Sequence, residues 1–295
     1  MEIEFINMPL NLGANKLGVE SAFQYLKKNS NIVDFFPKHK LLLNEEIQCP
    51  SFVNISSNEN LMKNKDEIFK CNKRLADITY NSIQNGRLPI IFGGDHSLSW
   101  GSISGSAKAH SNLGCIYLDA HGDFNSATTS PSHNVHGMHM AYLMGLVNSP
   151  YVNFYYSGRK LNKENVFFIG TRSLDQGEKK LAQQNKLQIY SSEDIQTQGI
   201  LNVSNILLNR IENSHIQHWH LSIDIDAIDP SLAPGTGVPE KNGLLVEDVE
   251  FFIQKVIKTN KIVSIDIVEY NPRLDIEDKT LNICNRILSA INEGL

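Results

Sequence analysis

Leu118-Asp119-Ala120-His121-Gly122-Asp123 places two carboxylates and an imidazole at i, i+2 and i+4, at the end of the apolar run 114–118. Side chains of a β-strand alternate between its two faces, so in a continued strand Asp119, His121 and Asp123 point to the same side. The stretch therefore predicts a buried strand that ends in a cluster of polar side chains.

Two further segments have the same form. Ser222-Ile223-Asp224-Ile225-Asp226 carries two carboxylates at i and i+2 on an apolar run, and Phe92-Gly93-Gly94-Asp95-His96 ends another run with a turn and a histidine. The three segments offer carboxylates and imidazoles without a thiolate, a set that suits divalent ions such as Mn²⁺ better than structural zinc. They predict a carboxylate-rich site large enough for two metal ions.

Short apolar runs alternate with longer amphipathic stretches, which is typical of a mainly parallel sheet covered by helices. Ligands of such α/β sheets bind beyond the carboxyl ends of the strands, where His96, Asp119 and Asp224 fall. Helix starts are indicated by Ser57-x-x-Asn60 and by Ser192-Glu193-Asp194; segment 38–57 gives no prediction. The predicted strands are 4–7, 88–92, 114–118, 166–169, 187–190, 219–225 and 262–268, and the predicted helices are 56–85, 179–185, 200–211 and 245–259.

Composition narrows the class of protein. The formal net charge of −5 gives no basic surface of the kind that binds nucleic acid or acidic lipid, so a small-molecule substrate is expected. No segment has the length of a membrane span, and the N-terminus lacks the features of a secretion signal. The four cysteines are scattered without a CxxC pair, which favours reduced thiols in a cytoplasmic protein; they are Cys49, Cys71, Cys115 and Cys284.

Each motif taken alone also has an ordinary structural explanation. Asp-x-His and Asp-x-Asp pairs are often turns or caps; His96 also fits a helix cap, and Asp229-Pro230 also fits a turn. The coincidence of these groups at three strand ends is harder to explain structurally, because buried like charges repel one another unless cations neutralise them. A metal site is therefore the favoured interpretation.

Four motifs together resemble the ureohydrolase superfamily, which includes arginase, agmatinase and formimidoylglutamase. They are residues 92–97, 119–125, 222–230 and 233–237, and the resemblance runs from Gly13 and 18–20 to 269–272. It is greatest to bacterial and protist arginases. The resemblance implies one three-layer α/β/α domain over residues 1–295, with a central parallel sheet, in a chain that assembles as a homo-oligomer, either a trimer or a hexamer.

The same resemblance implies two Mn²⁺ ions and a hydrolytic reaction. Two adjacent ions lower the pKa of a bridging water, and the resulting hydroxide attacks the guanidinium carbon of L-arginine, giving L-ornithine and urea. In this scheme Asp226 passes a proton to the leaving amine, and Glu269 pairs with the guanidinium. One ion would be held by His96, Asp119, Asp123 and Asp224, and the other by Asp119, His121, Asp224 and Asp226.

His136 matches a histidine that the family keeps at the mouth of the cleft, where it relays protons to bulk water. An imidazole with an ordinary pKa near 6.5 suits that task. Alternatively His136 only stabilises its loop, which also carries His133 and His139. The latter two histidines have no assigned role.

The choice of substrate depends on the amino-acid head group, because the metal chemistry is common to the superfamily. Asn125, Ser132 and Asn134 match arginase positions that hydrogen-bond the α-carboxylate. Asp175 matches the acid that meets the α-ammonium, and Glu178 would assist through water. For Asp175 a turn or helix cap is the alternative explanation.

Two departures from the arginase pattern bear on specificity. Val238 replaces a threonine, within a loop in which 240–243 also differ, and His133 replaces a glycine. Arginase is the predicted function. An agmatinase or another guanidino-compound ureohydrolase, and a catalytically inactive binding relative, remain the alternatives.

Overall fold

A single all-parallel sheet organises the part of the chain that the structure describes, residues 1–44, 46–50 and 61–295. The computed structural model orders its strands β2-β1-β3-β8-β7-β4-β5-β6. Central strands such as β4 and β5 are buried along their whole length, as a sheet covered on both faces requires. The strands are β1 (Glu2–Asn7), β2 (Lys40–Leu43), β3 (Arg87–Phe92), β4 (Leu113–Leu118), β5 (Val166–Ile169), β6 (Gln188–Tyr190), β7 (His218–Asp224) and β8 (Ile262–Val268).

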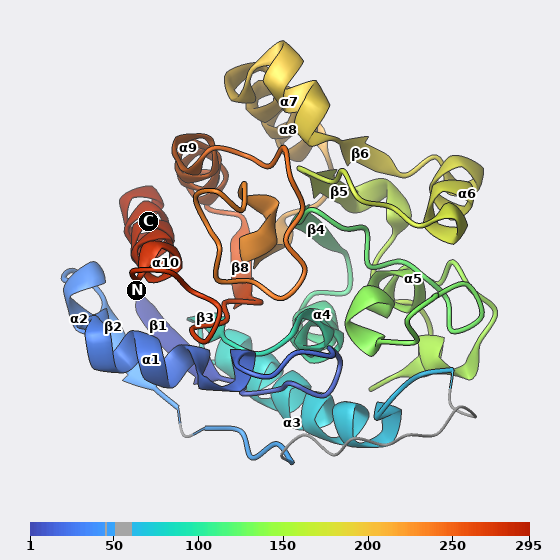
Figure 1. The fold of residues 1–295 in the computed structure, drawn as a ribbon, viewed down its shortest axis with the longest axis horizontal. Helices are drawn as coiled ribbons and strands as arrows, with labels where there is room; N and C mark the ends of the chain where they lie inside the picture. The colour runs from blue at the N-terminus through green and yellow to red at the C-terminus, as the bar shows by residue number, and fades with distance from the viewer. Residues whose placement is uncertain (45, 51–60) are drawn as a thin grey trace.

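Helices cover both faces of the sheet, so that α9 and α10 lie on one side of the strands and α3, α4 and α5 on the other (Figure 1). This arrangement confirms the predicted three-layer α/β/α fold. The helices are α1 (Ala22–Asn29), α2 (Ile32–Phe35), α3 (Lys65–Gln84), α4 (Ser99–Ala109), α5 (His139–Leu143), α6 (Gln176–Asn185), α7 (Ser192–Gln198), α8 (Ile200–Asn213), α9 (Val246–Ile257) and α10 (Lys279–Gly294).

Alternation along the strands divides the apolar side chains between two cores. In β4, Ile116 and Leu118 pack into the core beneath α1, α8, α9 and α10, whereas Cys115 and Tyr117 pack into the core beneath α3, α4 and α5. Burying an apolar side chain of this size contributes roughly 1.5–3 kcal/mol. A one-residue shift of a strand would exchange the two sets, so the alternation also fixes the register.

The order of the strands brings distant parts of the chain to one edge. After β3 the chain crosses to β4, and β7 and β8 later fill the space between them. The carboxyl ends of β3, β8, β7 and β4 are therefore neighbours, and this is where α/β sheets bind ligands. The segments that carry His96, Glu269, Asp224 and Asp119 leave the sheet at these four ends.

The predicted strands agree with the observed ones to within two residues, and β2 was not predicted. Among the described strands this edge strand pairs only with β1, and its four residues are exposed or half-buried. It falls within segment 38–57, for which the sequence gives no prediction. The predicted helix 56–85 begins only at Lys65 in α3, and the proposed start at Ser57 and Asn60 lies outside the described residues. The start predicted at Ser192 is displaced by one residue, because Ser191 caps α7.

None of the helices in the described part of the chain combines the length and the apolar character needed to cross a membrane.

Candidate metal centre

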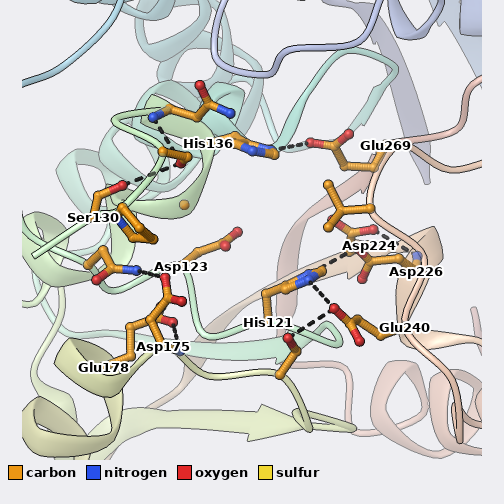
Figure 2. Close-up of a pocket in the computed structure, with 17 residues that line it drawn as sticks. His121, Asp123, Ser130, His136, Asp175, Glu178, Asp224, Asp226, Glu240 and Glu269 are labelled. Atoms are coloured by element: carbon orange, nitrogen blue, oxygen red, sulfur yellow. Dashed lines mark hydrogen bonds and ion pairs between the residues drawn. The ribbon is translucent and has the colours of Figure 1, made fainter.

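A polar cavity of about 270 Å³ opens at the carboxyl edge of the central strands (Figure 2). Its wall contains carboxylates and histidines from segments that are far apart in the sequence. The side chains most relevant to chemistry at this wall are His121, Asp123, Asn125, Ser132, Asn134, His136, Asp175, Glu178, Asp224, Asp226, Val238, Glu240 and Glu269.

Asp119, His121 and Asp123 do not lie on a continued strand, in which their spacing would have placed them on one face. Strand β4 ends at Leu118. Asp119 Oδ1 then accepts a hydrogen bond of 2.6 Å from the backbone N–H of His121, and Asp123 adopts a left-handed conformation with φ of 53°. These two features turn the chain away from the sheet. The three side chains therefore meet at the site because of a loop and not because of strand alternation.

Asp224 and Asp226 also leave the strand geometry expected from their spacing. Asp224 is the last residue of β7, and Asp226 lies in a 3-10 turn that spans Ile225–Ala227. Asp224 Oδ1 accepts a hydrogen bond of 2.8 Å from the backbone N–H of Asp226, which stabilises the turn. Asp226 Oδ1 in turn accepts one of 3.1 Å from the N–H of Ala120. The two Asp-containing loops are thus held against each other.

One imidazole nitrogen lies among three carboxylates. His96 Nδ1 is 2.9 Å from Asp119 Oδ2, 3.0 Å from Asp224 Oδ2 and 3.3 Å from Asp123 Oδ2. A ring nitrogen carries at most one proton, so it cannot satisfy three oxygens by donating hydrogen bonds. The four atoms belong to residues that are almost fully buried. This donor set fits a divalent cation.

A second imidazole forms an adjoining group. His121 Nδ1 lies 3.1 Å from Asp226 Oδ2 and 3.4 Å from Asp119 Oδ1. Asp119 therefore faces both imidazoles, one with each of its oxygens. All six predicted ligands are brought together in three overlapping groups. Two of the groups share Asp119, and the third joins His96 and Asp123 to His139, a histidine to which the sequence assigned no role.

Burial and neighbouring charges shift the pKa values of three of these carboxylates. Burial and the neighbouring Asp119 carboxylate raise the pKa of Asp123 to about 8. Burial, Asp226 and Asp119 raise the pKa of Asp224 well above its usual range. Burial alone would also raise the pKa of Asp119, but hydrogen bonding by His121 and His96 lowers it below its usual range. Bound cations would remove the repulsion among these groups.

Two residues that sequence analysis missed hold His96 and Asp123 in place. Ser222 Oγ lies 2.8 Å from His96 Nε2, so the other ring nitrogen, Nδ1, faces the carboxylates. Tyr117 Oη donates a hydrogen bond of 2.7 Å to Asp123 Oδ2. Hydrogen bonds of this kind orient metal ligands. Tyr117 and Ser222 lie two residues before the predicted ligands Asp119 and Asp224, and this spacing is a signal that could have identified them.

Glu269 and His136 form the inner wall beside the ligands. Glu269 Oε1 accepts a hydrogen bond of 2.9 Å from the backbone N–H of His96 and lies 3.0 Å from His136 Nδ1. Glu269 has a φ of 63°, an unusual conformation for a residue with a side chain, and such strain concentrates at functional sites. Burial lowers the pKa of His136, but the Glu269 and Asp123 carboxylates raise it to about 9.

The outer wall brings together the residues predicted to bind the amino-acid head group. Asn125 Nδ2 donates a hydrogen bond of 2.9 Å to Asp175 Oδ2. Asp175 also caps α6, so the cap that sequence analysis left as an alternative is present at a residue that lines the cavity. Ser132 Oγ accepts a hydrogen bond of 3.2 Å from the N–H of Asn134.

Both carboxylate oxygens of Glu178 accept hydrogen bonds from the backbone, so the side chain is held in place directly and not through water. Its Oε1 accepts a hydrogen bond of 3.1 Å from the N–H of Phe124, and its Oε2 accepts one of 2.9 Å from the N–H of Asp175. Burial raises the pKa of Glu178 to about 7. The contacts join the loop after Asp123 to the start of α6.

The two departures from the arginase pattern have clear structural positions. His133 has a φ of 57°, a conformation that glycine adopts readily, so the loop keeps a path suited to glycine although a histidine occupies it. Val238 lines the cavity and is 41% exposed, which places an apolar group where a hydroxyl was expected.

An all-parallel α/β/α sheet that gathers buried carboxylates and imidazoles at its carboxyl edge defines a metal-dependent hydrolase as the class of protein. The model of the Arginase family matches residues 1–292. The arginase of Bacillus subtilis is 33% identical over 281 residues, covering 94% of this chain and 93% of that protein. The chain belongs to the arginase family, whose members depend on metal ions.

Solved structures agree with this assignment. The arginase of Bacillus cereus superposes with a TM-score of 0.91 at 30% identity, covering 99% of this chain and 98% of the other. An arginase of Entamoeba histolytica, solved in complex with L-ornithine, gives a TM-score of 0.90 at 29% identity and covers 98% of each chain. The resemblance found in the motifs is therefore confirmed over the whole fold.

The crowding of carboxylates leads to a prediction about stability. Mn²⁺ at about 100 times its dissociation constant adds about 2.7 kcal/mol per site to the free energy of unfolding, which raises the melting temperature by several degrees. Asp224→Asn should abolish most of this rise, yet leave the melting temperature of the metal-free protein unchanged or higher, because it removes a buried like charge. Thermal melts with and without Mn²⁺ test both effects.

Asp34→Asn, at an exposed position of α2, provides the matched control and should behave as the unmodified chain. A lower melting temperature of metal-free Asp224→Asn would contradict the interpretation that the carboxylates repel one another.

Proposed function

We propose that the chain is an arginase, which hydrolyses L-arginine to L-ornithine and urea with two Mn²⁺ ions. The observation that carries this proposal is the pair of ligand groups that share Asp119, with Glu269 on one side and the Asn125–Asp175 pair at the outer rim. One ion would be held by His96, Asp119, Asp123 and Asp224, and the other by Asp119, His121, Asp224 and Asp226. The ions, when bound, lower the pKa of water and so supply a nucleophile near neutral pH.

Glu269 binds the guanidinium of the substrate. Its Oε1 is occupied by the His96 N–H and by His136, whereas Oε2 faces the space next to Gly237, where an added Cβ would lie 3.7 Å away. The Oε2 side of the carboxylate is therefore free for the N–H groups of a guanidinium. A charged hydrogen bond of this kind fixes both position and charge.

Asp226 and His136 move protons. Asp226 Oδ2 lies within the second ligand group, 3.1 Å from His121 Nδ1. It is therefore placed to take a proton from the nucleophile and pass it to the leaving amine. His136 lines the cavity and contacts Glu269, so it links the inner wall to solvent. A positioned acid or base typically contributes 10²- to 10⁴-fold to a rate.

Recognition of the head group falls to the outer wall. Asn125, Ser132 and Asn134 supply donors for the α-carboxylate, and Asp175 supplies the charge that meets the α-ammonium. Glu178 assists by holding the backbone of Asp175 in place. This division leaves the inner wall for the guanidinium and the outer wall for the amino acid.

Residues 1–295 act as one domain in this proposal, and the chain works in the cytoplasm as a homo-oligomer, a trimer or a hexamer. Support for the assembly and the compartment comes from the resemblance to arginases. Nucleic acid and membranes are not expected as partners, because the net charge is −5 and no basic surface was recognised in the sequence.

Parallel assays of urea release from L-arginine, agmatine and guanidinobutyrate, with the Mn²⁺-loaded protein and an EDTA-treated control, test the function. We expect the Mn²⁺-loaded protein to release urea from L-arginine in strong preference to the other two substrates. Preference for agmatine or guanidinobutyrate would favour the alternative, a different guanidino-compound ureohydrolase. Mn²⁺ that fails to bind, together with no urea release from any substrate, would favour an inactive binding relative.

Asp175→Ala should weaken arginine binding and leave metal binding unchanged. Loss of a hydrogen bond to a charged group costs about 1.5–3 kcal/mol, so KM for L-arginine should rise roughly 10- to 100-fold. Steady-state kinetics and Mn²⁺ dialysis measure the two effects. Ser191→Ala removes an equivalent cap from α7, away from the cavity, and controls for the lost helix cap. Equal losses of arginine and Mn²⁺ affinity would contradict the assigned role.

His136→Asn should leave the metals in place and lower kcat by about 10²-fold, because proton transfer to solvent loses its imidazole. His133→Asn makes the same change three residues earlier in the same loop, at a position where asparagine tolerates the left-handed conformation. It should retain full activity. Unchanged kcat in His136→Asn would remove this histidine from the mechanism.

A further inference from the structure

His121 Nε2, the ring nitrogen that points away from Asp119 and Asp226, lies near a carboxylate. His121 Nδ1 faces Asp226 and Asp119, so Nε2 is on the opposite side of the ring. Nε2 is buried and has no hydrogen-bond partner among the residues that the structure describes. The nearest carboxylate oxygen among them is Glu240 Oε1 at 3.8 Å (Figure 2). A buried ring nitrogen without a partner is costly to keep, so this pairing requires an explanation.

Glu240 is held toward His121 by Arg172 and Ser173, which lie in the loop after strand β5. Ser173 Oγ donates a hydrogen bond of 3.0 Å to Glu240 Oε1, the oxygen nearest to the imidazole. Arg172 Nη2 donates one of 2.9 Å to the carbonyl of Glu240, and its Nε donates one of 3.0 Å to the carbonyl of Lys241. Arg172 therefore holds the backbone of Glu240 in place, and Ser173 directs its side chain toward the imidazole.

Arg172 connects this loop to the metal ligands. Its Nη2 also donates a hydrogen bond of 2.7 Å to the carbonyl of Asp226, and its Nη1 donates one of 3.1 Å to the carbonyl of Ala227. The rigid guanidinium fork thus ties the loop of Glu240 to the turn that carries Asp226. The hydrogen bonds of Arg172 therefore position both Glu240 and Asp226, one of the proposed metal ligands.

We propose that Glu240 is a positioning residue that accepts the Nε2–H of His121 and thereby strengthens metal binding through Nδ1. This inference rests on the metal centre proposed above. A metal ion at Nδ1 leaves the only ring proton on Nε2, and a carboxylate acceptor fixes the orientation of the ring and makes the imidazole a more basic ligand. The side chain of Glu240 is 38% exposed, so it has room to approach the ring.

Contact with the substrate is the other role open to a carboxylate at this wall. The contacts favour an interaction with His121, because Oε1, the oxygen that accepts the hydrogen bond of Ser173, is also the one nearest to the imidazole. Residues 240–243 belong to the loop that departs from the arginase pattern, so the role of Glu240 is argued from its contacts in this chain and not from the family.

Equilibrium dialysis of Mn²⁺ against the unmodified chain, Glu240→Ala and Glu240→Gln tests the inference. Loss of such a partner typically weakens metal affinity 10- to 100-fold, so one of the two ions should bind at least tenfold more weakly to Glu240→Ala. Glu240→Gln should fall in between, because its amide oxygen still accepts the hydrogen bond without the charge. At saturating Mn²⁺, kcat and KM for L-arginine should return to nearly the original values.

Glu193→Gln, an exposed position of α7, controls for the lost negative charge and should bind Mn²⁺ normally. Unchanged affinity for both ions in Glu240→Ala would overturn the inference and leave the arginase proposal intact. A raised KM with unchanged Mn²⁺ affinity would instead make Glu240 a substrate ligand. An unmodified chain that binds no Mn²⁺ would overturn the proposed function itself.

Discussion

Repulsion among buried carboxylates is the constraint on which the site depends. Asp119, Asp123, Asp224 and Asp226 lie together with two imidazoles between them, in a region with almost no exposure to water. Burial and mutual repulsion raise the pKa of Asp123 to about 8 and that of Asp224 well above its usual range. Such a cluster opposes folding unless cations neutralise it, so the groups that destabilise the metal-free chain are the same ones that we propose as metal ligands.

The parallel sheet makes this concentration of charge possible. Strands β3, β8, β7 and β4 are neighbours, and each ends just before a segment that supplies a polar side chain to the cavity. Surrounding hydrogen bonds then fix these side chains. Ser222 orients His96, Tyr117 holds Asp123, and Arg172 joins the loops of Asp226 and Glu240. Rigid support of this kind is what a metal site requires in order to keep its ligands in place.

Sequence patterns predicted the central strands and the acidic and histidine residues that the structure brings together, because both depend on local residue types. They failed in the loop after β4, where a local hydrogen bond replaces the strand, and where the structure depends on distant contacts. The spacing of Asp119, His121 and Asp123 suggested a strand, but a hydrogen bond from His121 to Asp119 turns the chain into a loop. The contact of Glu240 with His121 and the edge strand β2 depend on partners far away in the sequence. No local sequence pattern predicts such contacts.

X-ray diffraction from crystals grown with Mn²⁺, recorded at the manganese absorption edge, tests the central claim most directly. Two anomalous peaks are expected, one among His96, Asp123 and Asp224 and the other between His121 and Asp226, with Asp119 next to both. A single peak, or peaks away from these residues, would contradict the account of a site built for two metal ions.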